Sequence, residues 1–132
     1  MAADEPNWLT PEQLIDINEE VVSATGEPFF VRDRGLLESA AERPCNYFAY
    51  NHERDVVTLA FVLLLGVAQN HPFEQGNKRT AFLGALEMLK SNGYEFEAPD
   101  TTETAATIEL AIEGVLDEDE FIETMRQYVT PS

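Results

Sequence analysis

The stretch VVTLAFVLLLGVA, Val56–Ala68, is apolar at almost every position and contains no charged residue. A helix that is apolar on all faces is surrounded by protein or by lipid. Its uninterrupted apolar run, Leu59–Ala68, is far shorter than the roughly 20 residues that a membrane-spanning helix needs. We therefore predict a helix from Glu53 to Asn70 that lies buried at the centre of a soluble domain.

A second helix with an apolar face follows closely, from Asn77 to Ser91, and Asn92-Gly93 is typical of a helix end. Four of its residues recur at helical spacing and are expected to face inward: Phe82, Leu83, Leu86 and Leu89. The segment that joins the two helices is consequently held from both sides by core elements.

Helices are also predicted on either side of this pair. Thr10-Pro11-Glu12-Gln13 combines an N-cap residue, a proline at N1 and a capping-box glutamine, and the helix that it opens ends at Gly26. The remaining predicted elements are helices Arg34–Arg43, ended by Pro44, Asp100–Leu116 and Asp117–Val129, and short strands in PFFVRD, Pro28–Asp33, and YEFEA, Tyr94–Ala98. The pattern predicts one domain, residues 1–132, folded as a compact all-α bundle of about six helices with at most a short β flap.

Charge and composition limit the partners. The chain has 25 acidic and eight basic residues and a formal net charge of −17, whereas an extended nucleic-acid surface needs clustered Lys and Arg, so we expect no direct nucleic-acid partner. The N-terminal segment MAADEPNWLTPEQ lacks the basic and apolar regions of a signal peptide. We expect a cytoplasmic protein without membrane contact. The single cysteine, Cys45, is interpreted as a packing residue.

The joining segment HPFEQGNKR, His71–Arg79, holds two of the eight basic residues. Gly76 permits a backbone turn with positive φ and leaves room for a ligand to approach closely. The helix that starts after it presents unpaired N–H groups and the positive end of its dipole, which together favour phosphate. Lys78 adds a point charge and Arg79 a planar fork, two complementary ways of holding phosphate oxygens. These features predict an anion-binding site.

Three other residues of the segment fit the same site. His71 is placed to take a proton from an incoming hydroxyl, Phe73 is expected to anchor the loop in the core, and Asn77 can donate to a phosphate or cap the helix. The residues alone also allow a structural histidine followed by an ordinary capped helix start, so both interpretations stay open at this point.

HPFEQGNKRTA resembles the signature of the Fic/Doc family, and Lys78 after the asparagine resembles its Doc branch. In the AMP-transferring Fic branch that position is usually glycine, and a second arginine stands three residues after the first, where this chain has Phe82. VRDRGLLESAAERP upstream and LKSNGYEF downstream also look Doc-like, so the similarity covers most of residues 9–95.

The resemblance implies a Fic/Doc-type helical bundle that acts as the toxin of a toxin–antitoxin pair. Doc-type members transfer the γ-phosphate of ATP to a threonine of elongation factor Tu. Carried over, His71 is the general base, and Gly76, Asn77, Lys78 and Arg79 hold the nucleotide phosphates. A magnesium ion bridges phosphate oxygens, and a flap, for which PFFVRD is the candidate, aligns the target segment as an added strand.

One position departs from the family pattern. The metal-binding Asp or Glu two residues after the phenylalanine is replaced by Gln75, and the acid sits one place earlier, at Glu74. Magnesium prefers carboxylate ligands, so Gln75 is a weak metal ligand at best. Two alternatives remain beside phosphoryl transfer: nucleotidyl (AMP) transfer to a protein hydroxyl, and a catalytically silent nucleotide- or partner-binding module.

Inhibition is expected to come from a separate antitoxin protein. Some Fic proteins carry an internal helix with Ser or Thr four residues before a Glu-Gly or Glu-Asn pair. Here the Glu-Gly pair Glu113-Gly114 is preceded at that position by Glu109, which does not match. Arg32 and Arg34 are interpreted either as contacts to nucleotide, target or antitoxin, or as surface ion pairs with Asp33 and Glu38.

Overall fold

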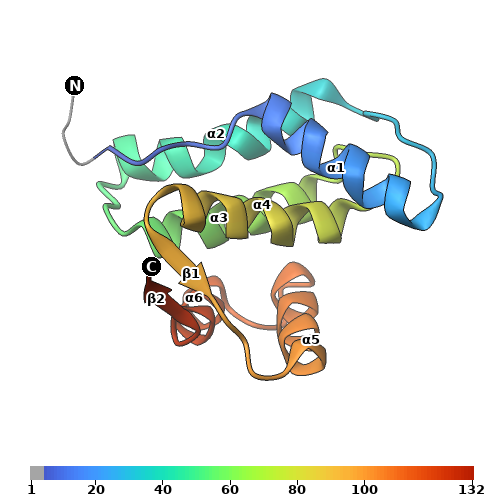
Figure 1. The fold of residues 1–132 in the computed structure, drawn as a ribbon. Coiled ribbons are helices and arrows are strands. Elements are labelled where there is room, and N and C mark those ends of the chain that lie inside the picture. The colour runs from blue at the N-terminus through green and yellow to red at the C-terminus, as the bar shows by residue number, and fades with distance from the viewer. Residues whose placement is uncertain (1–4) are drawn as a thin grey trace.

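A computed structural model describes residues 5–132, which form six helices and two short strands (Figure 1). In chain order these are α1 (Pro11–Thr25), α2 (Arg34–Tyr50), α3 (Val56–Asn70), α4 (Asn77–Ser91), β1 (Tyr94–Phe96), α5 (Thr101–Ile112), α6 (Glu118–Arg126) and β2 (Val129–Pro131). The predicted all-α architecture is confirmed. Among the described residues no helix is both long and apolar enough to cross a membrane.

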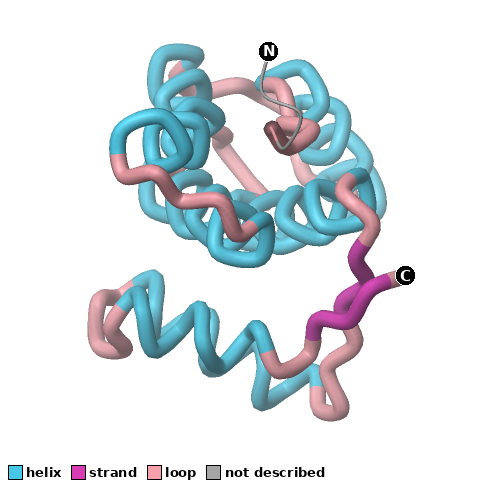
Figure 2. The backbone as a smooth tube through the Cα atoms, turned by 90° about the vertical axis from the view of Figure 1, so that its left-hand side faces the viewer, coloured by secondary structure: helices cyan, strands magenta, loops and turns pink. Residues whose placement is uncertain are grey.

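Helix α3 is the centre of the fold, as its composition predicts. Eleven of its residues are buried, in an unbroken run from Leu59 to Ala68 and at Val57. It packs against α2 and α4 on one side and against α5 and α6 on the other. Figure 2 shows α1–α4 as one group of helices, with α5 and α6 beside it and the strand pair at the edge. The helix therefore buries apolar side chains all round its axis.

Helices α1 and α4 approach closely at Gly84. A Cβ atom built there lies 2.9 Å from Cδ2 of Leu14, closer than a side chain tolerates. Helix α1 begins with the predicted capping box, in which Thr10 accepts from the Gln13 amide and the Gln13 side chain accepts from the Thr10 amide. The first helix is thus fixed at its start and pressed along its length onto α4.

The prediction that Pro44 ends the second helix is wrong, because α2 continues to Tyr50. A proline inside a helix cannot donate to the carbonyl four residues earlier, here that of Ala40. That part of α2 is pressed against α3, where a Cβ on Gly66 lies 3.4 Å from the Ala40 carbonyl oxygen. Pro44 is itself buried. Burial against α3 outweighs the lost hydrogen bond, which is a tertiary effect that local sequence does not reveal.

The strands also differ from expectation. YEFEA does contain strand β1, but its antiparallel partner is the C-terminal β2, with Glu95 opposite Thr130, so the pair encloses α5 and α6. The segment Pro28–Asp33 forms no strand. Its part in β structure is one antiparallel bridge, between Val31 and Phe73. The predicted flap is therefore an extended segment laid along the loop between α3 and α4.

Several predicted boundaries and one predicted orientation are also wrong. Helix α3 begins at Val56 rather than Glu53, and α5 ends at Ile112 rather than Leu116. Helix α6 stops at Arg126, after which the chain turns into β2. Leu83, expected to face inward, is 42% exposed. Leu89 is fully buried, as predicted. The rest of the buried face of α4 consists of Thr80, Ala81, Gly84, Ala85 and Met88, and α1 comes too close for a side chain at Gly84.

Candidate functional site

The loop between α3 and α4 has a left-handed residue at each end. His71 is the C-cap of α3 with φ of 50°, and Gly76 is the N-cap of α4 with φ of 76°. The His71 side chain is exposed. A Cβ on Gly76 lies 3.1 Å from Cγ1 of Val21 and of Val22, so a larger residue meets α1 as well as backbone strain. The glycine is required by both geometry and space.

Two side chains hold the loop in shape. Phe73 is 1% exposed and anchors it in the core, as predicted. The Asn77 amide makes a reciprocal pair with the same residue: its Oδ1 accepts from the Phe73 N–H at 2.9 Å and its Nδ2 donates to the Phe73 carbonyl at 2.8 Å. Asn77 therefore closes the turn, and its predicted contact with a phosphate stays a prediction.

The extended segment before α2 supports the loop from outside. The Arg32 and Asp33 amides donate to the Pro72 carbonyl at 2.8 and 3.1 Å. The Arg32 Nε donates to the His71 carbonyl at 2.8 Å, and its guanidinium also reaches the Asn70 carbonyl. Arg32 thus occupies the C-terminal end of α3, where a cation is favoured. Arg34, in contrast, forms the predicted ion pair with Glu38 and a second with Glu12.

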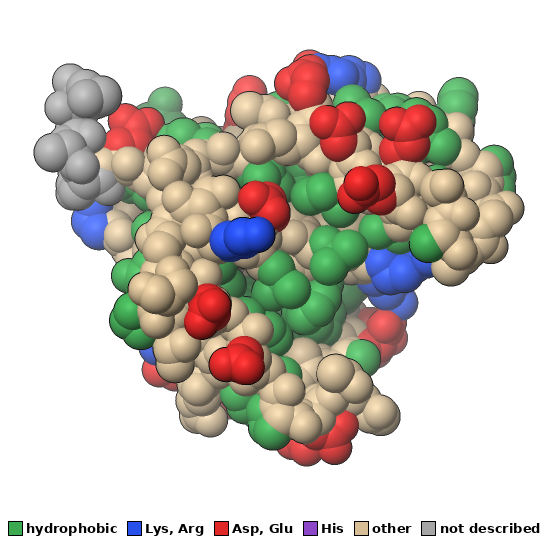
Figure 3. Space-filling model, in the orientation of Figure 1, with side chains coloured by type: hydrophobic (Ala, Val, Ile, Leu, Met, Phe, Trp, Pro, Cys, Tyr) green, Lys and Arg blue, Asp and Glu red, His purple; other side chains and the backbone are tan. Residues whose placement is uncertain are grey.

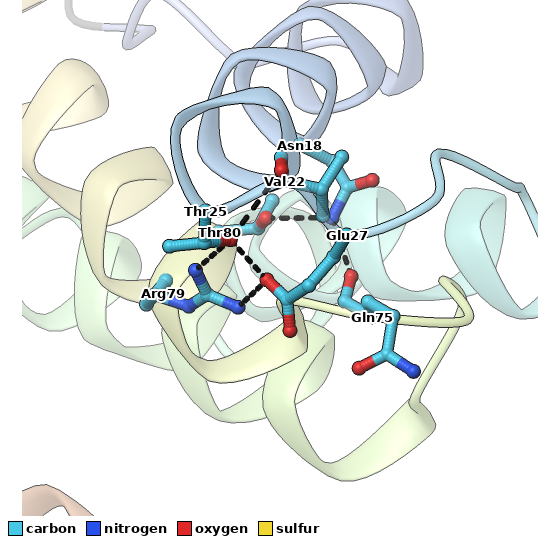
Figure 4. A network of polar contacts seen from close by, with 7 residues as sticks. All are labelled: Asn18, Val22, Thr25, Glu27, Gln75, Arg79 and Thr80. Atoms are coloured by element: carbon cyan, nitrogen blue, oxygen red, sulfur yellow. Dashed lines mark hydrogen bonds and ion pairs between the residues drawn. The ribbon is translucent and has the colours of Figure 1, made fainter.

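Helix α1 supports the loop from inside through Asn18. This side chain is fully buried, and its Nδ2 donates to the Gln75 carbonyl at 2.8 Å and to Oγ1 of Thr80 at 3.0 Å (Figure 4). Its Oδ1 has no partner among the described residues. An orphaned buried acceptor costs about 1–3 kcal/mol. The unpartnered Oδ1 therefore costs stability, while the two hydrogen bonds of Nδ2 tie the loop to α1 and α4.

The start of α4 is chemically unlike the other helix starts. Side-chain oxygens of Thr10, Asp33, Asp55, Asp100 and Asp117 accept hydrogen bonds from the first turns of the other five helices. Gly76 has no such side chain. Among residues 5–132, the Gly76, Lys78 and Arg79 amides make no hydrogen bond. Free N–H groups at the positive end of a helix dipole bind anions.

Both cations of the loop are paired with acidic side chains. Lys78 Nζ lies 2.5 and 2.8 Å from the two carboxylate oxygens of Glu109, on α5. The Arg79 guanidinium lies 2.5 Å from Glu27 and 3.2 Å from Oγ1 of Thr25, at the end of α1 (Figure 4). The Thr25 hydroxyl and then the Arg79 guanidinium lower the pKa of Glu27. The two cations thus point to opposite sides of the helix start.

A cleft of about 520 Å³ runs from these cations along α4 toward β1 and α5. Its walls are mainly apolar and include Phe82, Leu86, Phe96, Ala105 and Ile108. Figure 3 shows hydrophobic side chains gathered in the hollow between the α1–α4 group and α5. The volume is in the range of small-molecule sites, which are typically apolar with a few polar groups at one end.

Comparison with known proteins assigns the family. The family model described as Fic/DOC family matches residues 8–89. The chain belongs to the Fic/DOC family. It is 33% identical over 113 residues to "Protein kinase doc" of Escherichia phage P1, a match that covers 83% of this chain and 90% of that protein. It is 37% identical over 76 residues to "Toxin Doc" of Mycolicibacterium smegmatis, which covers 57% of this chain and 58% of that protein. These relatives support the Doc-like branch.

The Fic/DOC loop in this chain does not by itself provide a metal site. Nowhere in residues 5–132 do three His, Cys, Asp or Glu side chains come together in a way that fits a metal ion. Gln75 is half-buried, and its backbone carbonyl is held by Asn18. Its neutral amide is a poor substitute for the carboxylate that magnesium prefers. The donor set therefore does not fit magnesium, and the predicted metal role of Gln75 stays a prediction.

Sequence reasoning missed the partners of the loop. Asn18 occupies a position of the buried face of α1, between Leu14 and Val21, and a polar residue in that periodic pattern is a readable signal. The sequence does not indicate that Glu27 and Glu109 pair with the loop, because their position beside Arg79 and Lys78 depends on how α1 and α5 pack against α4. The loop itself was predicted from sequence, whereas the surroundings of its charges were not.

Proposed function

We propose that this chain is a Doc-like toxin that transfers the γ-phosphate of ATP to a hydroxyl group of a translation factor of the elongation factor Tu type. The observation that carries the proposal is the uncapped start of α4, with Lys78 and Arg79 in its first turn and an exposed His71 at the other end of the same short loop. The names of the two relatives, one a protein kinase and one a toxin, support it.

The nucleotide is proposed to lie across the start of α4. Phosphate oxygens are held by the backbone amides of Gly76 and Arg79 and by the side chains of Lys78 and Arg79. For this, the present ion pairs of Lys78 with Glu109 and of Arg79 with Glu27 must break. The apolar cleft beside Lys78 and Arg79 receives the nucleoside, with Phe82 and Phe96 as aromatic walls. Rings and phosphates then occupy neighbouring apolar and cationic regions.

In the proposed reaction, the His71 imidazole takes the proton of the target hydroxyl as its oxygen attacks the γ-phosphorus. The bond from the γ-phosphorus to the bridging oxygen breaks, and ADP leaves. The extended segment Pro28–Asp33 is proposed to align the target chain. Its inner edge is used by the loop, whereas the Val31 N–H and C=O have no partner among the described residues.

A separate antitoxin is the proposed inhibitor, as the toxin name of one relative suggests. A second candidate function is a silent binding module, which is favoured by the absence of a metal-ligand cluster in the part of the chain that the structure describes. Nucleotidyl transfer is less well supported, because Phe82 stands in the apolar cleft where that branch usually has its second arginine.

One experiment separates the three functions. The protein is incubated with cell extract and ATP labelled at either the α- or the γ-phosphate. Label from the γ-position alone on a protein band supports the kinase, label from the α-position supports nucleotidyl transfer, and no label from either supports the silent module. His71→Ala must abolish transfer and growth arrest if His71 is the base, whereas retained activity contradicts its role.

A further inference from the structure

The inference concerns Asn18, whose buried amide joins α1 to both sides of the α4 start. Its two donors are spent on the Gln75 carbonyl and the Thr80 hydroxyl, while Oδ1 is left without a partner among residues 5–132. If the side chain served only packing, an apolar residue of the same shape would serve as well or better. Packing alone therefore does not explain why Asn18 donates to the Gln75 carbonyl.

The Gln75 carbonyl is the group through which α4 could extend backward by one residue. In an α-helix each carbonyl accepts from the N–H four residues later, so the Gln75 carbonyl is the regular partner of the Arg79 N–H. Here Gly76 is left-handed, with φ of 76°, and the Gln75 carbonyl accepts from Asn18 instead, so that no hydrogen bond from the Arg79 N–H is found among the described residues. The first regular bond of the helix runs from the Thr80 N–H to the Gly76 carbonyl at 2.9 Å.

The same contact sets the direction of the next amide. No peptide bond in the described chain is cis, and in a trans peptide the carbonyl and the following N–H point in opposite directions. Because the Gln75 carbonyl points at Asn18 inside the protein, the Gly76 N–H points away from α1. One buried side chain thus influences two amides at the uncapped start of α4.

We propose that Asn18 is a positioning residue for the nucleotide site: it holds the Gln75 carbonyl away from α4, secures the left-handed turn at Gly76 before the helix starts, and keeps the Gly76 and Arg79 amides available to a phosphate group. The proposal rests on the proposed function, because it takes the ligand to be a nucleotide phosphate. Asn18 itself touches no ligand. It acts through the Gln75 peptide, and Thr80 fixes the amide that makes the contact.

The test compares Asn18→Leu, which keeps the approximate shape and removes the donors, with Thr58→Val as a matched control. The Thr58 hydroxyl also makes two hydrogen bonds, to Asp55 and Arg126, but near the N-terminal end of α3, remote from the loop. ADP binding is measured by calorimetry at a temperature where all proteins are folded. We expect ADP to bind at least about tenfold more weakly to Asn18→Leu, as for the loss of an oriented hydrogen-bonding group to an anion, and within about twofold of wild type to Thr58→Val.

Amide hydrogen exchange rates at the start of α4 distinguish this positioning role from a purely structural one, which would leave the Arg79 rate unchanged. In the wild-type protein without ligand, the Arg79 amide should exchange fast and the Thr80 amide slowly. In Asn18→Leu the Arg79 amide should become protected, because Gly76, which has no Cβ, can then take a right-handed helical conformation in which the released Gln75 carbonyl accepts from Arg79. Unchanged ADP affinity in a folded Asn18→Leu, or an equal loss in Thr58→Val, overturns the proposal.

If Asn18→Leu does not fold, hydrogen exchange of the wild-type protein still tests the proposal. An Arg79 amide that is as well protected as the Thr80 amide overturns it. If the wild-type protein binds no ADP, the proposed function fails. The exchange comparison between wild type and Asn18→Leu then still shows whether Asn18 sets the start of α4. The two failures are therefore distinguishable.

Discussion

The Arg79 guanidinium lies 2.5 Å from the Glu27 carboxylate, so the planar fork proposed for a nucleotide phosphate already holds an anion from the same chain. Lys78 is held by Glu109 in the same way. Both pairs are partly exposed, and such pairs are individually weak because solvent screens them. A phosphate group, with more charge and more oxygens than one carboxylate, can displace them.

Removing the charge of Glu27 should therefore strengthen nucleotide binding. We expect Glu27→Gln to bind ADP about two- to fivefold more tightly, the range that a weak exposed ion pair allows. Glu12→Gln is the matched control, because Glu12 pairs with Arg34 rather than with the loop. Calorimetry at low salt is the measurement. Equal affinities for wild type and Glu27→Gln contradict a competing role for the carboxylate.

The same residue should make stability depend on pH. The pKa of Glu27 is lowered from about 4.5, first by the Thr25 hydroxyl and then by Arg79. A group whose pKa is lower when folded stabilises the fold above its unfolded pKa and loses this contribution as pH falls through the folded value. The difference in Tm between wild type and Glu27→Gln should be present at pH 7 and shrink as pH falls below about 4.5. A constant difference across that range contradicts the assignment.

Gly76 should be much harder to replace than Gly93. Both have positive φ, which costs a non-glycine residue about 1–2 kcal/mol. A Cβ on Gly93 meets nothing within 4 Å, whereas one on Gly76 also presses on Val21 and Val22. We expect Gly76→Ala to destabilise by about 1–3 kcal/mol more than Gly93→Ala, the usual cost of overpacking. Urea unfolding measures the difference. Equal losses in the free energy of unfolding would show that α1 moves aside without an energetic cost.

His71 should separate stability from activity. Its φ of 50° is unfavourable for a side chain and neutral for glycine. We expect His71→Gly to be more stable than His71→Ala by about 1 kcal/mol, and both to lack transfer activity because neither carries an imidazole. Urea unfolding and the γ-label assay measure the two properties. A more stable alanine variant would contradict the backbone argument.

Local patterns predicted the helices well where the deciding contacts are themselves local. The capping box at Thr10 and the bounds of α4 at Asn77 and Ser91 are confirmed, because caps and turns are settled within a few residues. Pro44 misled for the opposite reason: its place inside α2 is decided by packing on α3. Strand β2 was missed because its partner lies 35 residues earlier in the chain, at Tyr94–Phe96.

The candidate site divides in the same manner. The loop residues from His71 to Arg79 were predicted because each residue type has a separate chemical task within nine positions. The surroundings were not, since Glu27, Glu109 and Arg32 reach the loop only through the packing of α1, α5 and the segment before α2. The polar contacts that decide charge and orientation are long-range, and one sequence does not specify them.

Gln75 provides the most direct test of the metal requirement. Its carbonyl is held by Asn18, so a change of side chain leaves the backbone of the loop in place. Gln75→Asp adds a carboxylate, the ligand that magnesium prefers, and should lower the magnesium concentration needed for half-maximal transfer of the γ-label by about an order of magnitude. Gln75→Asn is the matched control, because it has the same shape without the charge. If the aspartate and asparagine variants require the same magnesium concentration, position 75 takes no part in metal binding.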